Sequence, residues 1–187
     1  YQIKFMKVET TPIKDLLILT PKVFEDDRGY FLESFNSRAF RDAGLYYNFV
    51  QDNQSVSLKN VIRGLHFQKS APQAKLVRVI AGSIWDVAVD LRKGSQTFGK
   101  WFGVELNEDN FKQLLVPRGF AHGFSVLSNV AVVSYKCDEL YMQTAQGGIL
   151  YSDPTLKIDW RITERAIVSD KDGELPKFED IQKELNF

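Results

Sequence analysis

Residues 75–91 read KLVRVIAGSIWDVAVDL, and this stretch decides the expected fold. Apolar side chains recur at every second position on both sides of a short Ala-Gly-Ser break, which is the spacing typical of β-strands. The pattern predicts one strand at 75–80 and another at 84–91. The break at 81–83 is interpreted as a turn that joins the two strands as a hairpin.

The same alternation recurs on both sides of this stretch. Further strands are expected at 30–35, 49–58, 101–106, 114–116, 122–127 and 130–137, the last two as another neighbouring pair. Helical signals are few. They comprise 37–44, with Ser37 as the N-cap and Gly44 as the stop, one turn at 107–113, and a helix at 178–185. Many short strands separated by glycine-containing turns predict an all-β sandwich or barrel with a few short peripheral helices.

The chain of 187 residues shows no linker, repeat or low-complexity segment, so a single domain over 1–187 is predicted, with a helical tail at 173–187. Residues 1–5 precede Met6 and are interpreted as a leader foreign to the native protein. A native N-terminal extension is the alternative.

Charge and composition exclude several partners. Lys plus Arg and Asp plus Glu balance at 24 each, which argues against a nucleic-acid surface but leaves room for a local basic pocket. No apolar run approaches the roughly 20 residues of a membrane span, so no membrane partner is expected. The single Cys137 cannot form a disulfide within the chain, which fits a reducing cytoplasm.

Only two histidines, His66 and His122, occur in the chain, and both lie among apolar residues and glycines. Imidazole has the side-chain pKa nearest neutrality, so both are candidates for proton transfer. Two histidines and one cysteine are too few for a three-His or Cys/His metal centre, so no metal is expected.

A general base needs an orienting partner, and the carboxylates of residues 169–172 could bond the second ring nitrogen of His66. The alternative is that His66 is a satisfied core histidine. Tyr135 could likewise serve as a general acid or simply pack in an apolar strand. Arg63, next to Gly64, is the best candidate cation for phosphate, whereas the other basic residues are compatible with a solvated surface. Phosphate-loop and nucleophile-elbow motifs are absent.

A set of segments also occurs together and in order: DRGYFLESFN (27–36), FVQDN (49–53), RGLHFQ (63–68), KLVR (75–78), DVAVDLR (86–92), PRGFAHGF (117–124) and YK (135–136). Each segment alone is a modest signal, but the ordered set is highly specific. It resembles the dTDP-4-dehydrorhamnose 3,5-epimerase family of sugar-nucleotide epimerases. The resemblance covers about residues 12–172.

The resemblance implies a cupin-like β jelly roll (a double-stranded β-helix) that works without a metal or another cofactor. It also implies a homodimer whose partners exchange N-terminal strands. The implied reaction inverts C3 and C5 of a dTDP-linked 4-keto-6-deoxy sugar. It converts dTDP-4-dehydro-6-deoxy-glucose to dTDP-4-dehydro-L-rhamnose.

The resemblance further assigns roles to residues. His66 is expected to be the base, oriented by Asp172, with Tyr135 returning a proton from the opposite face and Lys75 near the C4 oxygen. Substrate contacts are expected at Arg28, Tyr30, Glu33, Gln51, Asp52, Asn53, Arg63, His122, Gln146 and Lys171. Arg28 suits the diphosphate, and some of these residues would serve the partner's site.

The chain departs from the family pattern at several positions. Leu140 stands where many relatives have an aromatic residue that stacks near the thymine, and Tyr141 next to it is expected to compensate. Gln146 replaces a common Glu, Gln54 a frequent His, and Val56 a frequent Arg.

Two other functions stay open. One is a single-position epimerase, acting at C3 only or C5 only, in a deoxysugar pathway. The other is a non-catalytic cupin that binds a sugar nucleotide. The joint presence of His66, Tyr135, Lys75 and Asp172 argues against the second, because binding alone needs no acid and base.

Overall fold

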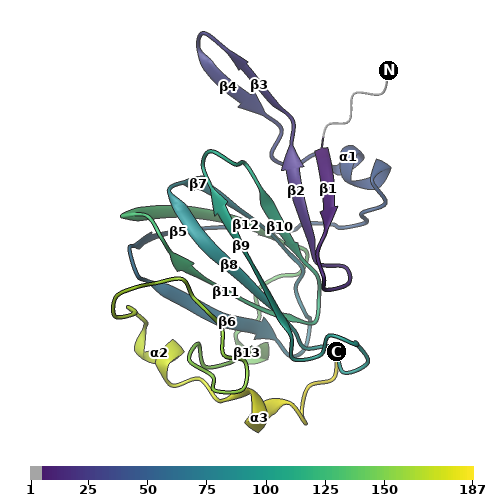
Figure 1. Ribbon diagram of the computed structural model, residues 1–187. Coiled ribbons are helices and arrows are strands. Elements are labelled where there is room, and N and C mark those ends of the chain that lie inside the picture. The colour runs from purple at the N-terminus through teal and green to yellow at the C-terminus, as the bar shows by residue number, and fades with distance from the viewer. Residues whose placement is uncertain (1–5) are drawn as a thin grey trace.

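The computed structural model describes residues 6–187, and two antiparallel β-sheets face each other in it (Figure 1). The leader expected at 1–5 lies outside the described residues. The six-stranded sheet has the order β1 (Met6–Thr10), β2 (Leu17–Pro21), β10 (Gln113–Val116), β7 (Lys75–Ala81), β12 (Val130–Cys137) and β5 (Gln51–Leu58). The five-stranded sheet has the order β13 (Gln146–Gly148), β6 (Ile62–Gln68), β11 (Phe120–Val126), β8 (Ser83–Asp90) and β9 (Trp101–Asn107). The predicted cupin-like jelly roll is confirmed.

The main core lies between the two sheets, because each strand turns every second side chain inward. Buried residues of both sheets pack together there, among them Val77, Val79, Ile84, Ala88, Leu114, Phe120, Phe124 and Val133. Tyr135 packs against this cluster as a partly buried member. Side chains that share this inward direction therefore face one another across the sandwich.

A second cluster lies on the other face of the five-stranded sheet. The opposite side chains of β6 and β8, such as Leu65, Phe67 and Val87, pack there under residues 149–187. This C-terminal segment contains α2 (Asp170–Gly173) and α3 (Phe178–Ile181) and runs beneath β6 and β13 in yellow in Figure 1. The helical tail expected at 173–187 is only partly helical, since α3 ends at Ile181 rather than at residue 185.

The outer face of the six-stranded sheet is covered at one end by α1 (Ser37–Asp42), whose Phe40 packs with Leu19, Leu76 and Leu115. The N-cap is Asn36 rather than Ser37, since the Asn36 side chain accepts hydrogen bonds from the first turn. No helix in residues 6–187 has the length and apolarity needed to cross a membrane.

Two predicted strand pairings are wrong, although the strands themselves are present. β7 and β8 belong to different sheets, and so do β11 and β12. Alternation identifies a strand but not its partner, and Gly82 forms a corner between sheets instead of a hairpin turn. Its φ is +81°, and a Cβ there would lie 2.1 Å from the carbonyl oxygen of Val130.

Other elements were missed or misread. The helical turn expected at 107–113 is an Asx-type turn, because the Asn107 side chain accepts from the N–H groups of Asp109 and Asn110. Strands β1, β2, β13 and β3 (Val23–Asp26) and the 3₁₀ helix η1 (Gln143–Ala145) were not predicted. The strand expected at 30–35 ends at Leu32 as β4 (Gly29–Leu32).

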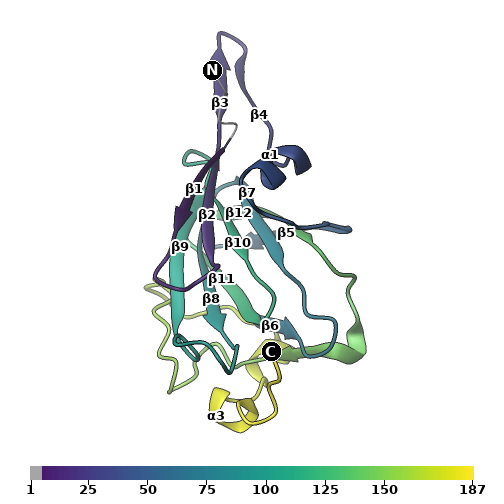
Figure 2. The same ribbon diagram turned by 90° about the vertical axis from the view of Figure 1, so that its right-hand side faces the viewer.

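The hairpin of β3 and β4 projects away from the body of the sandwich (Figures 1 and 2). Its aromatic side chains are exposed, with 58% of Tyr30 and 65% of Phe31 accessible to solvent. A two-stranded ribbon has too little apolar burial to be stable alone, so this hairpin is suited to reach another molecule.

Candidate active site

His66 lies on the inner face of β6, opposite in direction to Leu65 and Phe67. Its Nε2 lies 2.7 Å from Oδ1 of Asp172, which comes from α2. A carboxylate can only accept, so Nε2–H donates and Nδ1 remains as the basic nitrogen. The sequence expectation that a carboxylate of residues 169–172 bonds this ring is confirmed.

An irregular β6 brings Arg63 and His66 to the same face although they are three residues apart. The register between β6 and β11 shifts so that His66 pairs with His122 and Arg63 with Phe124. Gly64 makes this possible, with φ of +113° and no space for a side chain, since a Cβ would lie 2.7 Å from the Gly123 Cα.

Asp172 is held as an anion although it is buried. Burial acts to raise its pKa, but the hydrogen bonds from His66 and from the Gly64 N–H, 3.1 Å from Oδ2, outweigh burial and leave the pKa below its usual value. The side chain of Ser169 caps α2 by accepting from the Asp172 N–H. The carboxylate is therefore fixed in position and charged at neutral pH.

Tyr135 lies on β12 in the facing sheet, directed into the inter-sheet core. Burial raises the pKa of its phenol most strongly, the neighbouring Cys137 adds to the rise, and Arg63 opposes it. The phenol therefore stays protonated through the neutral range and can donate a proton. His66 and Tyr135 thus stand on opposed inner faces of the sandwich.

Lys75, at the start of β7, shares its inward direction with Val77 and Val79. Within residues 6–187 its ammonium has no hydrogen bond or ion pair. Burial lowers its pKa, while the charges of Cys137 and Asp86 act to raise it. An unpaired, partly buried ammonium on the inner face is available to an anionic oxygen.

His122, on β11, forms a second histidine–carboxylate pair. Its Nε2 lies 2.7 Å from Oδ1 of Asp86 on β8, and both side chains are buried. The other oxygen of Asp86, Oδ2, has no hydrogen-bond partner among the described residues 6–187. The pair therefore leaves His122 Nδ1 and one carboxylate oxygen free.

Strand β5 contributes amides to the same face. Asn53 pairs directly with Tyr135 in the sheet and donates to the Cys137 Sγ at 3.6 Å, while Gln51 donates to Asn53 Oδ1 at 3.0 Å. Arg63 reaches across to β5 and donates to Ser57 Oγ at 2.8 Å. These contacts fix a polar set of side chains beside the apolar core.

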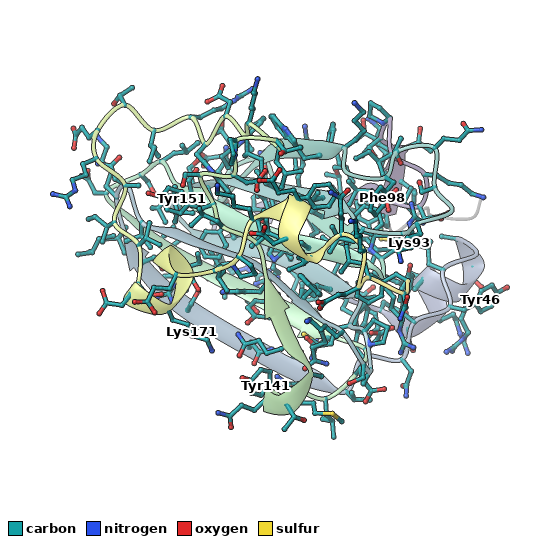
Figure 3. All side chains as sticks on the ribbon, turned by 90° about the horizontal axis from the view of Figure 1, so that it is seen from below. Tyr46, Lys93, Phe98, Tyr141, Tyr151 and Lys171 are labelled. Carbon is teal, nitrogen blue, oxygen red and sulfur yellow. The ribbon has the colours of Figure 1, made fainter. Side chains whose placement is uncertain are left out.

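Gln146 links two further residues next to the His66–Asp172 pair. Its Oε1 accepts from Lys171 Nζ and from the Tyr141 hydroxyl, both at 2.8 Å. Figure 3 shows Lys171 and Tyr141 from below, exposed on the same side of the molecule. Because Oε1 takes both donors, the amide N–H groups of Gln146 have no partner within the described part of the chain and are available to a ligand.

Four residues expected to contact substrate lie elsewhere in this chain. Arg28 sits at the tip of the projecting hairpin and is paired with Asp26. Tyr30, on β4, packs against Phe111 in the loop between β9 and β10, and Glu33 accepts from Asn36. Asp52 points away from the inner face, where it is paired with Lys136 at 2.8 Å.

A surface cavity of about 670 Å³ is lined by none of the expected site residues. It lies between residues 44–48 and the turns at Asp15 and Arg118, on the outer side of the six-stranded sheet. Its lining combines an Arg118–Asp138 ion pair with tyrosines and holds no histidine. The candidate chemistry is therefore located at the polar inner faces rather than in this cavity.

Sequence reasoning missed Asp86 and Cys137, which share the inner face with Lys75. Alternation contained the signal for Asp86, because Ile84 and Ala88 on either side of it are core residues. A carboxylate in the middle of an otherwise apolar strand indicates a buried polar contact.

The arrangement is suited to moving a proton at carbon. A carboxylate-held imidazole and a protonated phenol face each other, with an unpaired ammonium beside them to stabilise an oxyanion. Within residues 6–187, no three His, Cys, Asp or Glu side chains lie close enough to hold a metal ion.

Comparison with known proteins gives a consistent result over nearly the whole chain. A family model described as dTDP-4-dehydrorhamnose 3,5-epimerase matches residues 10–180. The dTDP-4-dehydrorhamnose 3,5-epimerase of Escherichia coli K12 is 52% identical over 172 residues, covering 91% of this chain and 93% of that protein.

Solved structures agree with the sequence comparison. A Legionella pneumophila dTDP-6-deoxy-D-glucose-3,5-epimerase in complex with dTDP-4-keto-L-rhamnose is 46% identical, with a TM-score of 0.93 over 96% of each chain. A double mutant of a 3′-monoepimerase from Streptomyces bikiniensis, in complex with dTDP, is 27% identical. Its TM-score is 0.88 over 93% of this chain and 88% of that chain.

Proposed function

The chain belongs to the dTDP-4-dehydrorhamnose 3,5-epimerase family, and we propose on that premise that it inverts C3 and C5 of dTDP-4-dehydro-6-deoxy-glucose to give dTDP-4-dehydro-L-rhamnose. The observation that carries the proposal is the placement of His66 and Tyr135 on opposed inner faces. Inversion needs a base on one face of the sugar ring and an acid on the other.

The chemistry follows from the C4 ketone, because both C3 and C5 are adjacent to it. His66 Nδ1 removes the proton from one of these carbons, and the electron pair moves onto the C4 oxygen as an enolate. Lys75 stabilises that oxygen where the charge develops. Tyr135 then protonates the carbon from the opposite face, which inverts it, and exchange with water resets both groups.

Asp172 supports the base. It accepts the hydrogen bond from Nε2–H of His66 and so keeps the basic lone pair on Nδ1, where it is free to take a proton. As His66 takes up a proton, the carboxylate stabilises the resulting imidazolium. We assign Asp172 to the site for this reason.

We further propose that the dTDP-sugar substrate is bound by a set of residues that this chain shares with a second copy. Gln51, Asn53, Arg63, His122, Gln146 and Lys171 would act within the chain, and Arg28, Tyr30 and Glu33 would serve the partner's site. The projecting hairpin supports this proposal, because Arg28 lies in the turn between β3 and β4, and that hairpin projects from the opposite end of the molecule to β6, which carries His66 (Figure 1). Asp52 would contribute through its backbone, since its side chain is paired with Lys136.

The oligomer in this proposal is a homodimer with exchanged N-terminal strands. The exposed Tyr30 and Phe31 are the apolar surface that exchange would bury. A cytoplasmic location is proposed from the single buried Cys137.

Turnover in D₂O tests the reaction. The expected result is deuterium at both C3 and C5 of the dTDP sugar, read by NMR together with the inverted product. Deuterium at one carbon only would indicate the single-position epimerase. The 27% identity to the monoepimerase, against 52% to the E. coli enzyme, favours two positions. Absence of exchange, with dTDP still bound, would indicate a non-catalytic binding protein.

A further inference from the structure

Asp86 is a fully buried carboxylate for which the proposed reaction has no use. It lies on the inner face of β8 between Ile84 and Ala88, with none of its surface accessible to solvent. His122 satisfies Oδ1, and no group in the part of the chain that the structure describes satisfies Oδ2. A buried carboxylate with an unpaired oxygen costs stability, so its presence here calls for a specific reason.

The ammonium of Lys75 faces the same interior and has no hydrogen bond or ion pair with any residue from Met6 to Phe187. The titratable groups on the inner faces around it are Tyr135 and Cys137 on β12, Asp86 on β8, His122 on β11, and Arg63 and His66 on β6. Of these, only Cys137 and Asp86 act to raise the pKa of Lys75 against the effect of burial. Burial in turn raises the pKa of the Cys137 thiol, which therefore carries no charge at neutral pH.

Asp86 is thus the anion left to balance Lys75. Resting on the proposed epimerase function, we propose that Asp86 is a positioning residue whose carboxylate keeps the Lys75 ammonium charged in the interior until the C4 oxygen becomes negative. One of its oxygens aligns His122, and the other supplies the negative charge. Asp86 touches no reacting atom in this role.

The physical reason is the penalty for burying an isolated cation. An ammonium taken out of water loses its proton unless an opposite charge lies nearby. A neutral Lys75 amine would be a poor donor to an enolate, so loss of Asp86 would reduce turnover at a pH where wild type is still active. The variant without Asp86 would then lose turnover first at the alkaline end of its pH profile.

The test compares Asp86→Asn with wild type and with Cys137→Ala as a matched control from the same surroundings. Acetylation of Lys75 by acetic anhydride is followed against pH by mass spectrometry of the peptide, and kcat is measured over the same range. Asp86→Asn should lower the midpoint of Lys75 acetylation by at least about one pH unit and move the alkaline limb of kcat by the same amount. Cys137→Ala should leave the acetylation midpoint unchanged.

An unchanged acetylation midpoint in folded Asp86→Asn would overturn the inference, as would an equal shift in Cys137→Ala. Should Asp86→Asn not fold, as judged by circular dichroism, Asp86→Ser removes the same charge and gives the same comparison. The acetylation readout does not depend on turnover. A wild-type enzyme that exchanges no deuterium would therefore refute the proposed reaction, while the effect of Asp86 on Lys75 would still be decided.

Discussion

Oδ1 of Asp172 lies 2.7 Å from Nε2 of His66, across 106 residues of sequence. The two residues come from different layers, one from an inner strand and the other from the C-terminal segment that covers the sheet. Because the carboxylate takes the Nε2 proton, the imidazole has one defined tautomer, with Nδ1 free to accept a proton.

Replacing His66 by Ala should lower deuterium exchange at both C3 and C5 by about 10²–10⁴-fold, since the same base serves both carbons. Binding of dTDP should change little, because the proposed nucleotide contacts lie on other residues. NMR of the sugar in D₂O and calorimetry with dTDP measure the two effects. Exchange that persists at the wild-type rate would rule out His66 as the base.

Replacing Tyr135 by Phe should separate exchange from inversion. The base would still remove a proton and return deuterium to the same face, but the opposite face would lack its donor. We expect measurable exchange with inverted product reduced by about 10²-fold or more. A normal yield of inverted sugar from this variant would assign the acid to another group.

Acid should weaken the fold partly through Asp172. Its pKa is lowered in the folded state, so its contribution to the free energy of unfolding is present above about pH 4 and is lost as the pH falls further. Urea unfolding at several pH values should show Asp172→Asn less stable than wild type at pH 7, with the difference between the two shrinking as the pH falls below the ordinary carboxyl range. Asp26→Asn, at an exposed hairpin tip, is the control and should give a much smaller difference.

Subunit mixing should reveal whether Arg28 serves the neighbouring site. Arg28→Ala and His66→Ala would each be impaired as homodimers. Mixing and reassembling them should restore about a quarter of wild-type activity, because half of the dimers would contain one intact composite site. If Arg28 acted within its own chain, mixing would restore nothing.

Gln146 gives a prediction specific to this chain. Gln146→Glu keeps the acceptor for Lys171 and Tyr141 but removes the free amide donor and adds a negative charge beside Lys171. We expect the Kd for dTDP to rise about 3- to 10-fold, with a shallower dependence on salt as Lys171 becomes neutralised. A Kd unchanged at low ionic strength would show that Gln146 does not face the nucleotide.

Strand positions could be predicted from the sequence because alternation is a local property. The predictions at 49–58 and 130–137 agree closely with β5 and β12. Strand partners could not be predicted, since the corner at Gly82 and a hairpin turn have the same local composition. The difference lies in contacts with Val130, far along the chain.

The same distinction between local and distant information applies to the residues of the candidate site. His66 and a carboxylate at 169–172 could be named from residue chemistry, whereas the placement of Tyr135 opposite His66 required the two sheets. Asp86 was overlooked although alternation places it on the same face as the core residues Ile84 and Ala88, which indicates a buried carboxylate. What the local pattern does not contain is its hydrogen-bond partner, because His122 lies 36 residues away on β11.

The segment after β13 both covers the apolar face of the five-stranded sheet and orients the catalytic imidazole, so neither role can be removed without the other. Trp160, Phe178 and Leu185 seal one side of the sandwich, and Asp172 from the same segment orients the imidazole of His66. Deleting this segment to obtain a smaller biocatalyst would expose the apolar outer face of the five-stranded sheet. The same deletion would remove the carboxylate that orients His66. A miniaturised version of this scaffold must therefore leave its last forty or so residues whole.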